Sequence, residues 1–146
     1  MAWVESRRAT FVLALAGIFV WTASPASAQE DKPYTVQDGK VDQGTFNGWR
    51  RYHASCHTCH GPDGLGSSYA PNLVDSMKTL SYEDFVEVVI NGRENVTTGQ
   101  QNVMPAFGMV QDVAIYIDDL YAYLQARADG VLGRGRPERL PAEQAG

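Results

Sequence analysis

The chain has 146 residues, of which 44% are hydrophobic and 20% are charged, and its formal net charge is −5. This length predicts one domain with its own core rather than several. The acidic balance argues against nucleic-acid binding, because the protein would have no electrostatic hold on phosphates.

The first 28 residues have the pattern of a secretory signal peptide. Arg7-Arg8 precedes an apolar run over 11–21, and Ala26-Ser27-Ala28 supplies the small residues of a cleavage site. The alternative is a membrane anchor, but a spanning helix needs about 20 apolar residues, and this run breaks at 22–25. We therefore expect a signal peptide over 1–28, export to the periplasm, and no membrane anchor after cleavage.

The rest of the chain divides into a polar N-terminal extension over 29–41, a domain over 42–130 and a polar tail over 131–146. Within the extension, Asp38-Gly39 predicts the turn of a small hairpin. The tail is rich in charge, glycine and proline and, from Gly133 onward, offers nothing to bury. We expect it to be solvated; the alternative is that it docks a partner.

Three main helices are predicted in the domain. The first runs from Asp42 or Gly44 to about Ser55, where aromatic residues recur every three positions. The second covers 81–91, with Ser81 as its cap and Gly92 as its stop.

The third helix covers about 112–128, where apolar residues recur at helical spacing before Gly130. The segment 61–72 is rich in glycine and proline, and 93–103 is polar, so both are predicted to be loops. The pattern as a whole favours an all-α fold with long loops and essentially no sheet.

The segment Cys56-His57-Thr58-Cys59-His60 carries the clearest chemistry, because C-x-x-C-H spacing is typical of c-type haem attachment. One helical turn separates the two cysteines, so both sulfurs can reach the same porphyrin edge and form thioethers. His60 lies four residues after Cys56 on that face, where its imidazole can bind the iron. We predict one covalent haem c, attached through Cys56 and Cys59, with His60 as an axial ligand.

Three other interpretations compete for this segment. A structural zinc site needs four ligands, and the chain has no second Cys/His cluster. A thioredoxin-like dithiol needs a βαβ setting, which the sequence does not indicate. A disulfide would close a loop too short to add much stability and leaves His60 unused.

His53 and His57 are assigned no role in binding iron.

The other axial ligand must come from a distant part of the chain, and methionine is the favoured residue type. Met77 precedes a predicted helix and is expected to fill the core. Met109 lies just before the last helix, where packing is the usual role. Met104 follows a polar, glycine-bearing segment and precedes Pro105, which suits a side chain directed inward from an extended segment. We therefore favour Met104; its thioether would raise the reduction potential.

These spacings resemble those of class I c-type cytochromes. Gly48, Tyr52 and Cys56 resemble the family's first-helix residues, and the resemblance implies that Gly48 lets the last helix approach closely. Pro71, eleven residues after His60, resembles the family proline whose carbonyl accepts the ring N–H of the ligand histidine. Met104, in the sequence MPAFG, resembles the axial methionine. The resemblance implies a class I cytochrome c fold wrapped around one covalent haem.

A closer resemblance, over 50–85, 91–108 and 116–140, is to periplasmic cytochromes of methanol metabolism. It implies an electron carrier rather than an enzyme, with a PQQ-dependent alcohol dehydrogenase as donor and a terminal oxidase or second cytochrome as acceptor. Two alternatives remain open: a general respiratory cytochrome c, and a haem enzyme or gas-binding protein with an open iron site.

Overall fold

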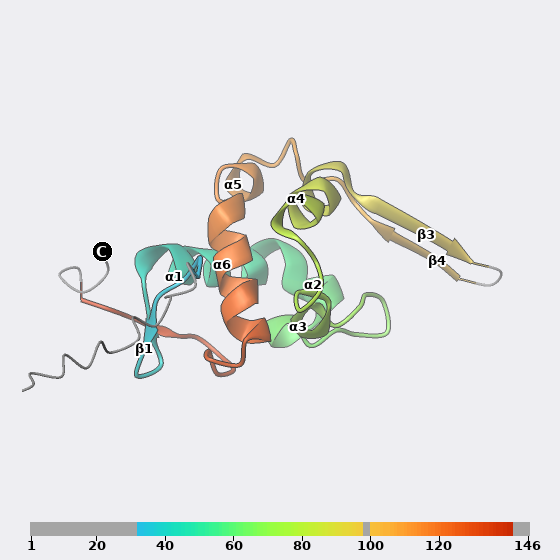
Figure 1. The fold of residues 1–146 in the computed structure, drawn as a ribbon. Coiled ribbons are helices and arrows are strands. Elements are labelled where there is room, and N and C mark those ends of the chain that lie inside the picture. Colours follow the sequence, from blue (N-terminus) through green and yellow to red (C-terminus); the bar gives the residue numbers. More distant parts are fainter. Residues whose placement is uncertain (1–31, 98–99, 142–146) are drawn as a thin grey trace, which may run out of the picture.

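The structure is a computed structural model, and it describes residues 32–97 and 100–141. The expected signal peptide lies outside the described residues. Helices surround a central helix, α6 (Ile117–Ala128), which α1 (Gln43–Arg51) crosses (Figure 1). The remaining helices are η1 (Tyr52–Cys56), α2 (His57–His60), η2 (Pro62–Gly64), α3 (Leu73–Ser76), α4 (Tyr82–Asn91) and α5 (Gln111–Ala114). The predicted, mainly helical fold is confirmed.

The crossing of α1 and α6 depends on the absence of a side chain at Gly48. A Cβ atom added to Gly48 would lie 1.8 Å from the carbonyl oxygen of Asp119 and 2.8 Å from Cβ of Tyr123. No side chain fits in that space, so only glycine allows the two backbones to meet. The expected close approach at Gly48 is confirmed.

The first predicted helix is continuous but changes its winding. Asp42 caps it, accepting a hydrogen bond from the backbone N–H of Thr45 at 2.9 Å. After Arg51, the helix widens into the π-helical segment η1 and then returns to α geometry in α2. Such π segments are uncommon and often lie at functional sites; this one leads directly into the two cysteines.

The second and third helices match their predicted positions, with one difference. Ser81 caps α4 by accepting from the N–H of Asp84, and α4 ends before Gly92 as expected. The third helix is divided: α5 ends at Ala114 and α6 begins at Ile117. The backbone leaves helical geometry at Tyr116, whose ψ is 29°.

The expectation of essentially no sheet is wrong. The predicted hairpin forms as β1 (Val36–Gln37) and β2 (Lys40–Val41), and β5 (Glu138–Arg139) adds to it in parallel. A second hairpin, β3 (Arg93–Thr97) with β4 (Gln100–Met104), replaces the predicted polar loop and projects from the body (Figure 1). Its strands pair antiparallel, with Arg93 opposite Met104.

The tail is not simply solvated, which corrects a second expectation. Strand β5 pairs with β2, and the backbone N–H of Leu140 donates to the Val41 carbonyl at 2.8 Å. Leu132 and Leu140 are buried. A short polar tail therefore buries apolar side chains, because it folds back onto the N-terminal hairpin.

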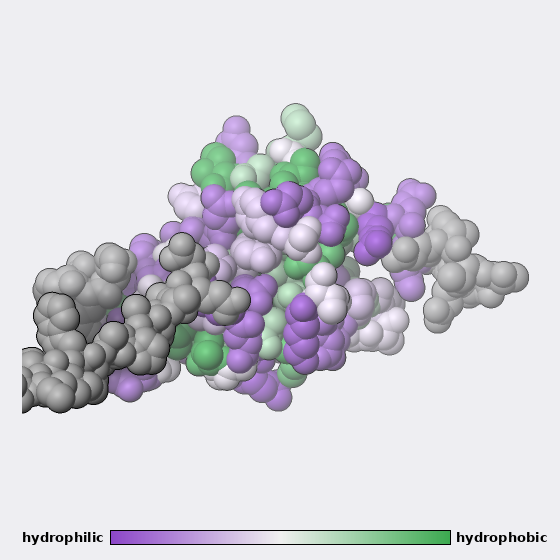
Figure 2. Space-filling view, in the orientation of Figure 1, coloured by the Kyte–Doolittle hydropathy of each residue, from purple (hydrophilic) through white to green (hydrophobic). Residues whose placement is uncertain are grey.

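The core lies where α1, α4 and α6 meet, and Met77 belongs to it as expected. Its fully buried large side chains include Tyr52, Leu120 and Tyr123. The packing role expected of Met109 is wrong, because 96% of this residue is exposed. Figure 2 shows apolar residues near α5 on an otherwise largely polar face. None of the helices between residues 32 and 141, masked positions aside, has the length and apolar character needed to cross a membrane.

Candidate functional site

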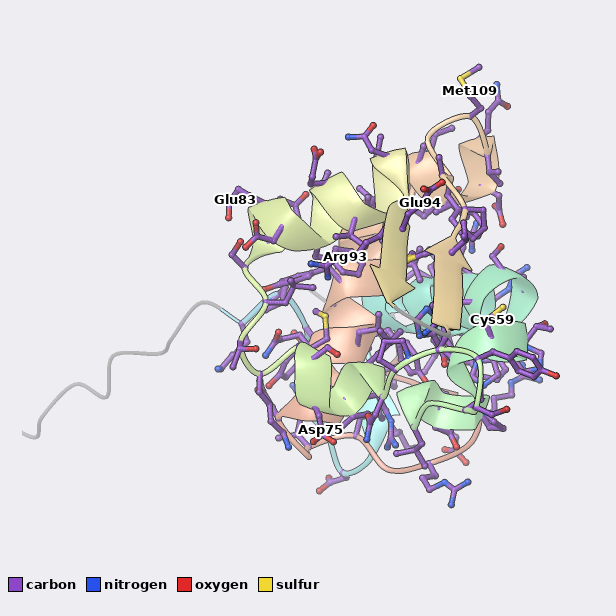
Figure 3. The ribbon with its side chains drawn as sticks, turned by 90° about the vertical axis from the view of Figure 1, so that its right-hand side faces the viewer. Cys59, Asp75, Glu83, Arg93, Glu94 and Met109 are labelled. Atoms are coloured by element: carbon purple, nitrogen blue, oxygen red, sulfur yellow. The ribbon has the colours of Figure 1, made fainter. Side chains whose placement is uncertain are left out.

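The attachment segment begins in η1 and ends with α2. Cys56 closes the π-helical segment and is partly buried, whereas Cys59 is exposed at the surface of α2 (Figure 3). His60, the last residue of α2, is only 7% exposed. One short stretch of helix thus presents two thiols and a buried imidazole.

A hydrogen bond to the next loop orients the imidazole of His60. Its Nδ1 lies 3.1 Å from the carbonyl oxygen of Pro71. The carbonyl can only accept, so Nδ1 carries a proton, and in the neutral form of the ring Nε2 keeps its lone pair. A neutral imidazole with a free Nε2 is the form that binds a metal ion.

Tight closure of the loop from 61 to 72 brings Pro71 to His60. The N–H of Gly66 donates to the His60 carbonyl at 2.7 Å. Gly61 has a φ of 73°, and a Cβ atom there would lie 2.3 Å from the Gly66 carbonyl oxygen. The glycines of this loop therefore make room for the backbone contact that places Pro71 beside the imidazole.

Both cysteines are free thiols in the structure. Burial raises the pKa of the Cys56 thiol to about 11, and the neighbouring Cys59 makes a smaller contribution in the same direction. Cys56 thus stays protonated at neutral pH before any attachment. Among residues 32–97 and 100–141, no three His, Cys, Asp or Glu side chains are placed to share a metal ion, so the zinc alternative lacks its ligand set there.

Met104 comes from a separate element. It is the last residue of β4, partly buried, and packs against the core. The segment after it is fixed to the end of α4, because Phe107 and Gly108 donate backbone hydrogen bonds to Val89 and Ile90. Met109, by contrast, points away from the body at the top of Figure 3, whereas Cys59 lies lower on the right-hand side. Of the two candidate methionines, only Met104 contacts the core.

Two histidines near the motif have structural partners of their own. His53 Nδ1 lies 2.9 Å from the Trp49 carbonyl, and His57 Nδ1 lies 2.7 Å from the His53 carbonyl. Their rings stack, with centroids 5.7 Å apart. Both imidazoles therefore contact the preceding helical turn through Nδ1, and assigning them no role in binding iron stays a prediction.

The sequence analysis missed Asp63, the most connected polar side chain near the motif. It is 5% exposed, and its carboxylate accepts from Arg134 Nε at 3.1 Å and from the Gly135 N–H at 3.0 Å. Arg127 Nε also donates to its backbone carbonyl. The loop after His60 is thus joined to the C-terminal tail. An Asp-Gly pair predicts only a turn, and its distant partners leave no local signal.

Comparison with known proteins places this geometry in a family. The family model described as "Cytochrome C oxidase, cbb3-type, subunit III" matches residues 45–124, which include the attachment segment. The chain belongs to the c-type cytochromes.

Two curated cytochromes match most of the chain. Cytochrome c-553I of Paracoccus denitrificans is 51% identical over 114 residues, covering 77% of this chain and 50% of that protein. Cytochrome c-555 of Methylococcus capsulatus is 45% identical over 100 residues, covering 68% and 75% respectively. This cytochrome therefore spans half the length of the first relative and three quarters of the second.

A solved structure agrees with the fold. The crystal structure of the c-type cytochrome XoxG from Methylobacterium extorquens AM1 superposes with a TM-score of 0.64 at 45% identity, covering 77% of this chain and 75% of that chain. The relatives are cytochromes c, which transfer electrons. This cytochrome is accordingly an electron-transfer protein and not an enzyme.

The residues present fit covalently bound haem c, which the family implies. Two free thiols three residues apart match the two thioether links, and the adjacent imidazole presents a free Nε2. When bound, the haem supplies an iron that gains and loses one electron. Cys56 and Cys59 would hold the group, and the imidazole of His60, which is only 7% exposed, would face it away from water.

Proposed function

We propose that this cytochrome is exported to the periplasm and carries single electrons on one haem c, with His60 and Met104 as its axial ligands. The observation that carries the ligand assignment is the hydrogen bond from His60 to Pro71, because it leaves Nε2 as the available donor atom. The partial burial of Met104 against the core supports it as the second ligand. With both axial positions filled by protein, the site suits electron transfer rather than binding of a gas.

We further propose that the electron donor is a quinoprotein (PQQ) methanol or alcohol dehydrogenase and that the acceptor is a terminal oxidase or a second cytochrome. The segments that resemble cytochromes of methanol metabolism support this donor. A further relative, the fructose dehydrogenase cytochrome subunit of Gluconobacter japonicus, is 37% identical over 68 residues. By its name that relative is the cytochrome subunit of a dehydrogenase, and the match covers 44% of this chain and 14% of that protein; it supports a dehydrogenase as the donor, without indicating its cofactor.

One observation favours a second candidate, a respiratory cytochrome unconnected with alcohol oxidation. The matching family model is named for a subunit of a cbb3-type oxidase. In that case the reductant would be another component of a respiratory chain.

Stopped-flow mixing with a dehydrogenase separates the two candidates. The oxidised cytochrome is mixed with alcohol-reduced quinoprotein dehydrogenase from the same organism, and haem reduction is followed by absorbance. Reduction within the turnover time of the dehydrogenase, together with impaired growth on the alcohol after gene deletion, is the expected result. Reduction far slower than turnover, with normal growth on alcohols, would favour the respiratory carrier.

The optical spectrum tests the ligand set separately. A low-spin haem with His and Met ligands has a far-red charge-transfer band in its oxidised state. We expect that band in the purified protein and no spectral change on adding carbon monoxide to the reduced form. A shift with carbon monoxide would point to an open iron site.

A further inference from the structure

Where the C-terminal tail folds back against α1, three arginines line one groove of about 330 Å³. Phe46, Trp49 and Arg50 of the groove come from α1, and Arg136 and Arg139 come from the tail. The groove therefore exists only because β5 docks beside β2 (Figure 1). We call it the arginine groove.

The positive charges of the arginine groove are not neutralised within the described chain. Most of the other basic side chains in the described chain form salt bridges with carboxylates. Those that do are Lys32, Lys40, Arg51, Lys78 and Arg134. Across residues 32–97 and 100–141, by contrast, no salt bridge joins Arg50, Arg136 or Arg139 to a carboxylate, and no acidic residue lines the groove. A protein with a net charge of −5 thus keeps an uncompensated basic groove.

Aromatic rings orient the guanidinium groups without using their hydrogen-bond donors. The Arg136 Cζ atom lies 5.5 Å from the Phe46 ring centroid and 5.6 Å from that of Trp49. Arg139 lies 5.4 Å from the Phe46 centroid and donates one bond, from Nη1 to Gln43. A guanidinium above a ring keeps its N–H edges free for planar acceptors, so both arginines remain available to a ligand.

One residue that lines the groove has an unsatisfied donor. The indole Nε1–H of Trp49 is buried and has no acceptor in the structure. Buried donors nearly always have a partner. Trp49 lines the groove, so its indole N–H signal reports on what binds there.

We propose that the arginine groove docks a carboxylate-rich segment of a redox partner protein. Clustered arginines recognise acidic motifs because each guanidinium can bind a carboxylate through two parallel hydrogen bonds. A groove with three guanidiniums suits several carboxylates on one chain better than one small anion. The net negative charge of the chain disfavours such a partner elsewhere, so the groove fixes its orientation. This inference does not depend on which dehydrogenase donates the electrons.

Nuclear magnetic resonance on the processed holoprotein tests the proposal, because Trp49 is the only tryptophan after residue 28. The nitrogen-15-labelled, reduced cytochrome is titrated at low salt with acetyl-hexaglutamate amide. The single indole N–H signal should shift in a saturable way. The double variant Arg136→Gln/Arg139→Gln should bind the peptide at least roughly fivefold more weakly, since two exposed ion pairs are lost. Its visible spectrum should match the wild type, which checks folding.

Arg93→Gln is the matched control, because Arg93 also lacks a salt bridge among the described residues but lies on β3, outside the groove. It should bind the peptide as the wild type does. Three results would overturn the proposal: no saturable shift, an equal shift with acetyl-hexaglutamine amide, or unchanged affinity in the double variant. If inorganic phosphate, at a concentration that supplies as much negative charge as the peptide, produces the same shift, the groove binds small anions and the docking proposal fails.

Discussion

At the scale of single residues, the site depends on three neighbouring side chains whose spacing is local. The two thiols and the imidazole belong to one stretch from 56 to 60, so a linear motif predicts them without knowledge of the fold. Pro71 was assigned through family resemblance, and its contact with His60 is present in the structure. Asp63 could not be predicted, because its partners Arg134 and Gly135 are about 70 residues away in sequence.

We predict that the haem of the wild type survives extraction with acidified acetone, whereas Cys56→Ala or Cys59→Ala weakens or abolishes its retention. The reason is that thioether bonds resist acid while axial ligation alone does not. The measurement is the absorbance left with the precipitated protein. Ser55→Ala, next to the motif, should retain the haem fully. Free extraction from the wild type would contradict covalent attachment.

Met104→Ala should remove the far-red charge-transfer band and lower the reduction potential. A thioether ligand favours ferrous iron, so its loss stabilises the oxidised state. Potentiometric titration and the oxidised spectrum give both values. Met109→Ala is the control: Met109 is 96% exposed, so removing its side chain should change neither the band nor the potential. If the control variant loses the band instead, the ligand assignment is reversed.

At the scale of elements, the sequence predicts what local chemistry determines. The helix over 82–91 has a cap at Ser81 and a stop at Gly92, and both are in place. The hairpin of β3 and β4 is polar and lacks alternating hydrophobic residues, so periodicity could not find it. Strand β5 has only two residues, and only its distant partner β2 makes it a strand.

The contact of α1 with α6 leads to a prediction about stability. Ala is a better helix former than Gly by about 1 kcal/mol, yet Gly48→Ala should destabilise the cytochrome by about 1–3 kcal/mol, as overpacked cores do. The added Cβ would lie 1.8 Å from the Asp119 carbonyl oxygen, and a backbone atom cannot move aside without separating the helices. Urea unfolding of the oxidised protein at neutral pH measures the change.

Gly133→Ala provides the comparison for that measurement. A Cβ atom at Gly133 meets nothing within 4 Å, so its effect should stay within about 0.5 kcal/mol, as is usual for surface substitutions. Equal unfolding midpoints for Gly48→Ala and the wild type would show that the helix crossing tolerates a side chain.

At the scale of the whole molecule, the hairpin of β1 and β2 pairs with β5 of the tail, and the loop after His60 is joined to the same tail. Arg127, in α6, connects these parts, donating to the carbonyls of Asp63 and Leu132. The tail therefore supports the loop that follows His60 and also forms the arginine groove. A sequence reading treats the tail as an appendage because its contacts with Asp63 and with β2 are distant in sequence.

Asp63→Asn tests this connection, since it keeps the shape of the side chain but removes its charge. Burial opposes ionisation of Asp63, but the N–H of Gly135 and the guanidinium of Arg134 outweigh it and hold the carboxyl pKa below its ordinary range. Hydrogen bonds to a charged group contribute about 1.5–3 kcal/mol. We expect the variant to be less stable than the wild type at pH 7 by an amount of about that size.

The pH dependence has a defined sign. A lowered pKa in the folded state gives stability that is complete above the unfolded value, about 3.9 for aspartate, and is lost as the pH falls through the folded value. The wild type should therefore lose this contribution in acid, while Asp63→Asn has no carboxyl there to titrate. The urea midpoints of the two proteins are compared at pH 7 and near pH 3. They should differ most at pH 7 and approach each other in acid. A gap that is the same at both pH values would show that the Asp63 carboxylate does not hold the tail through its charge.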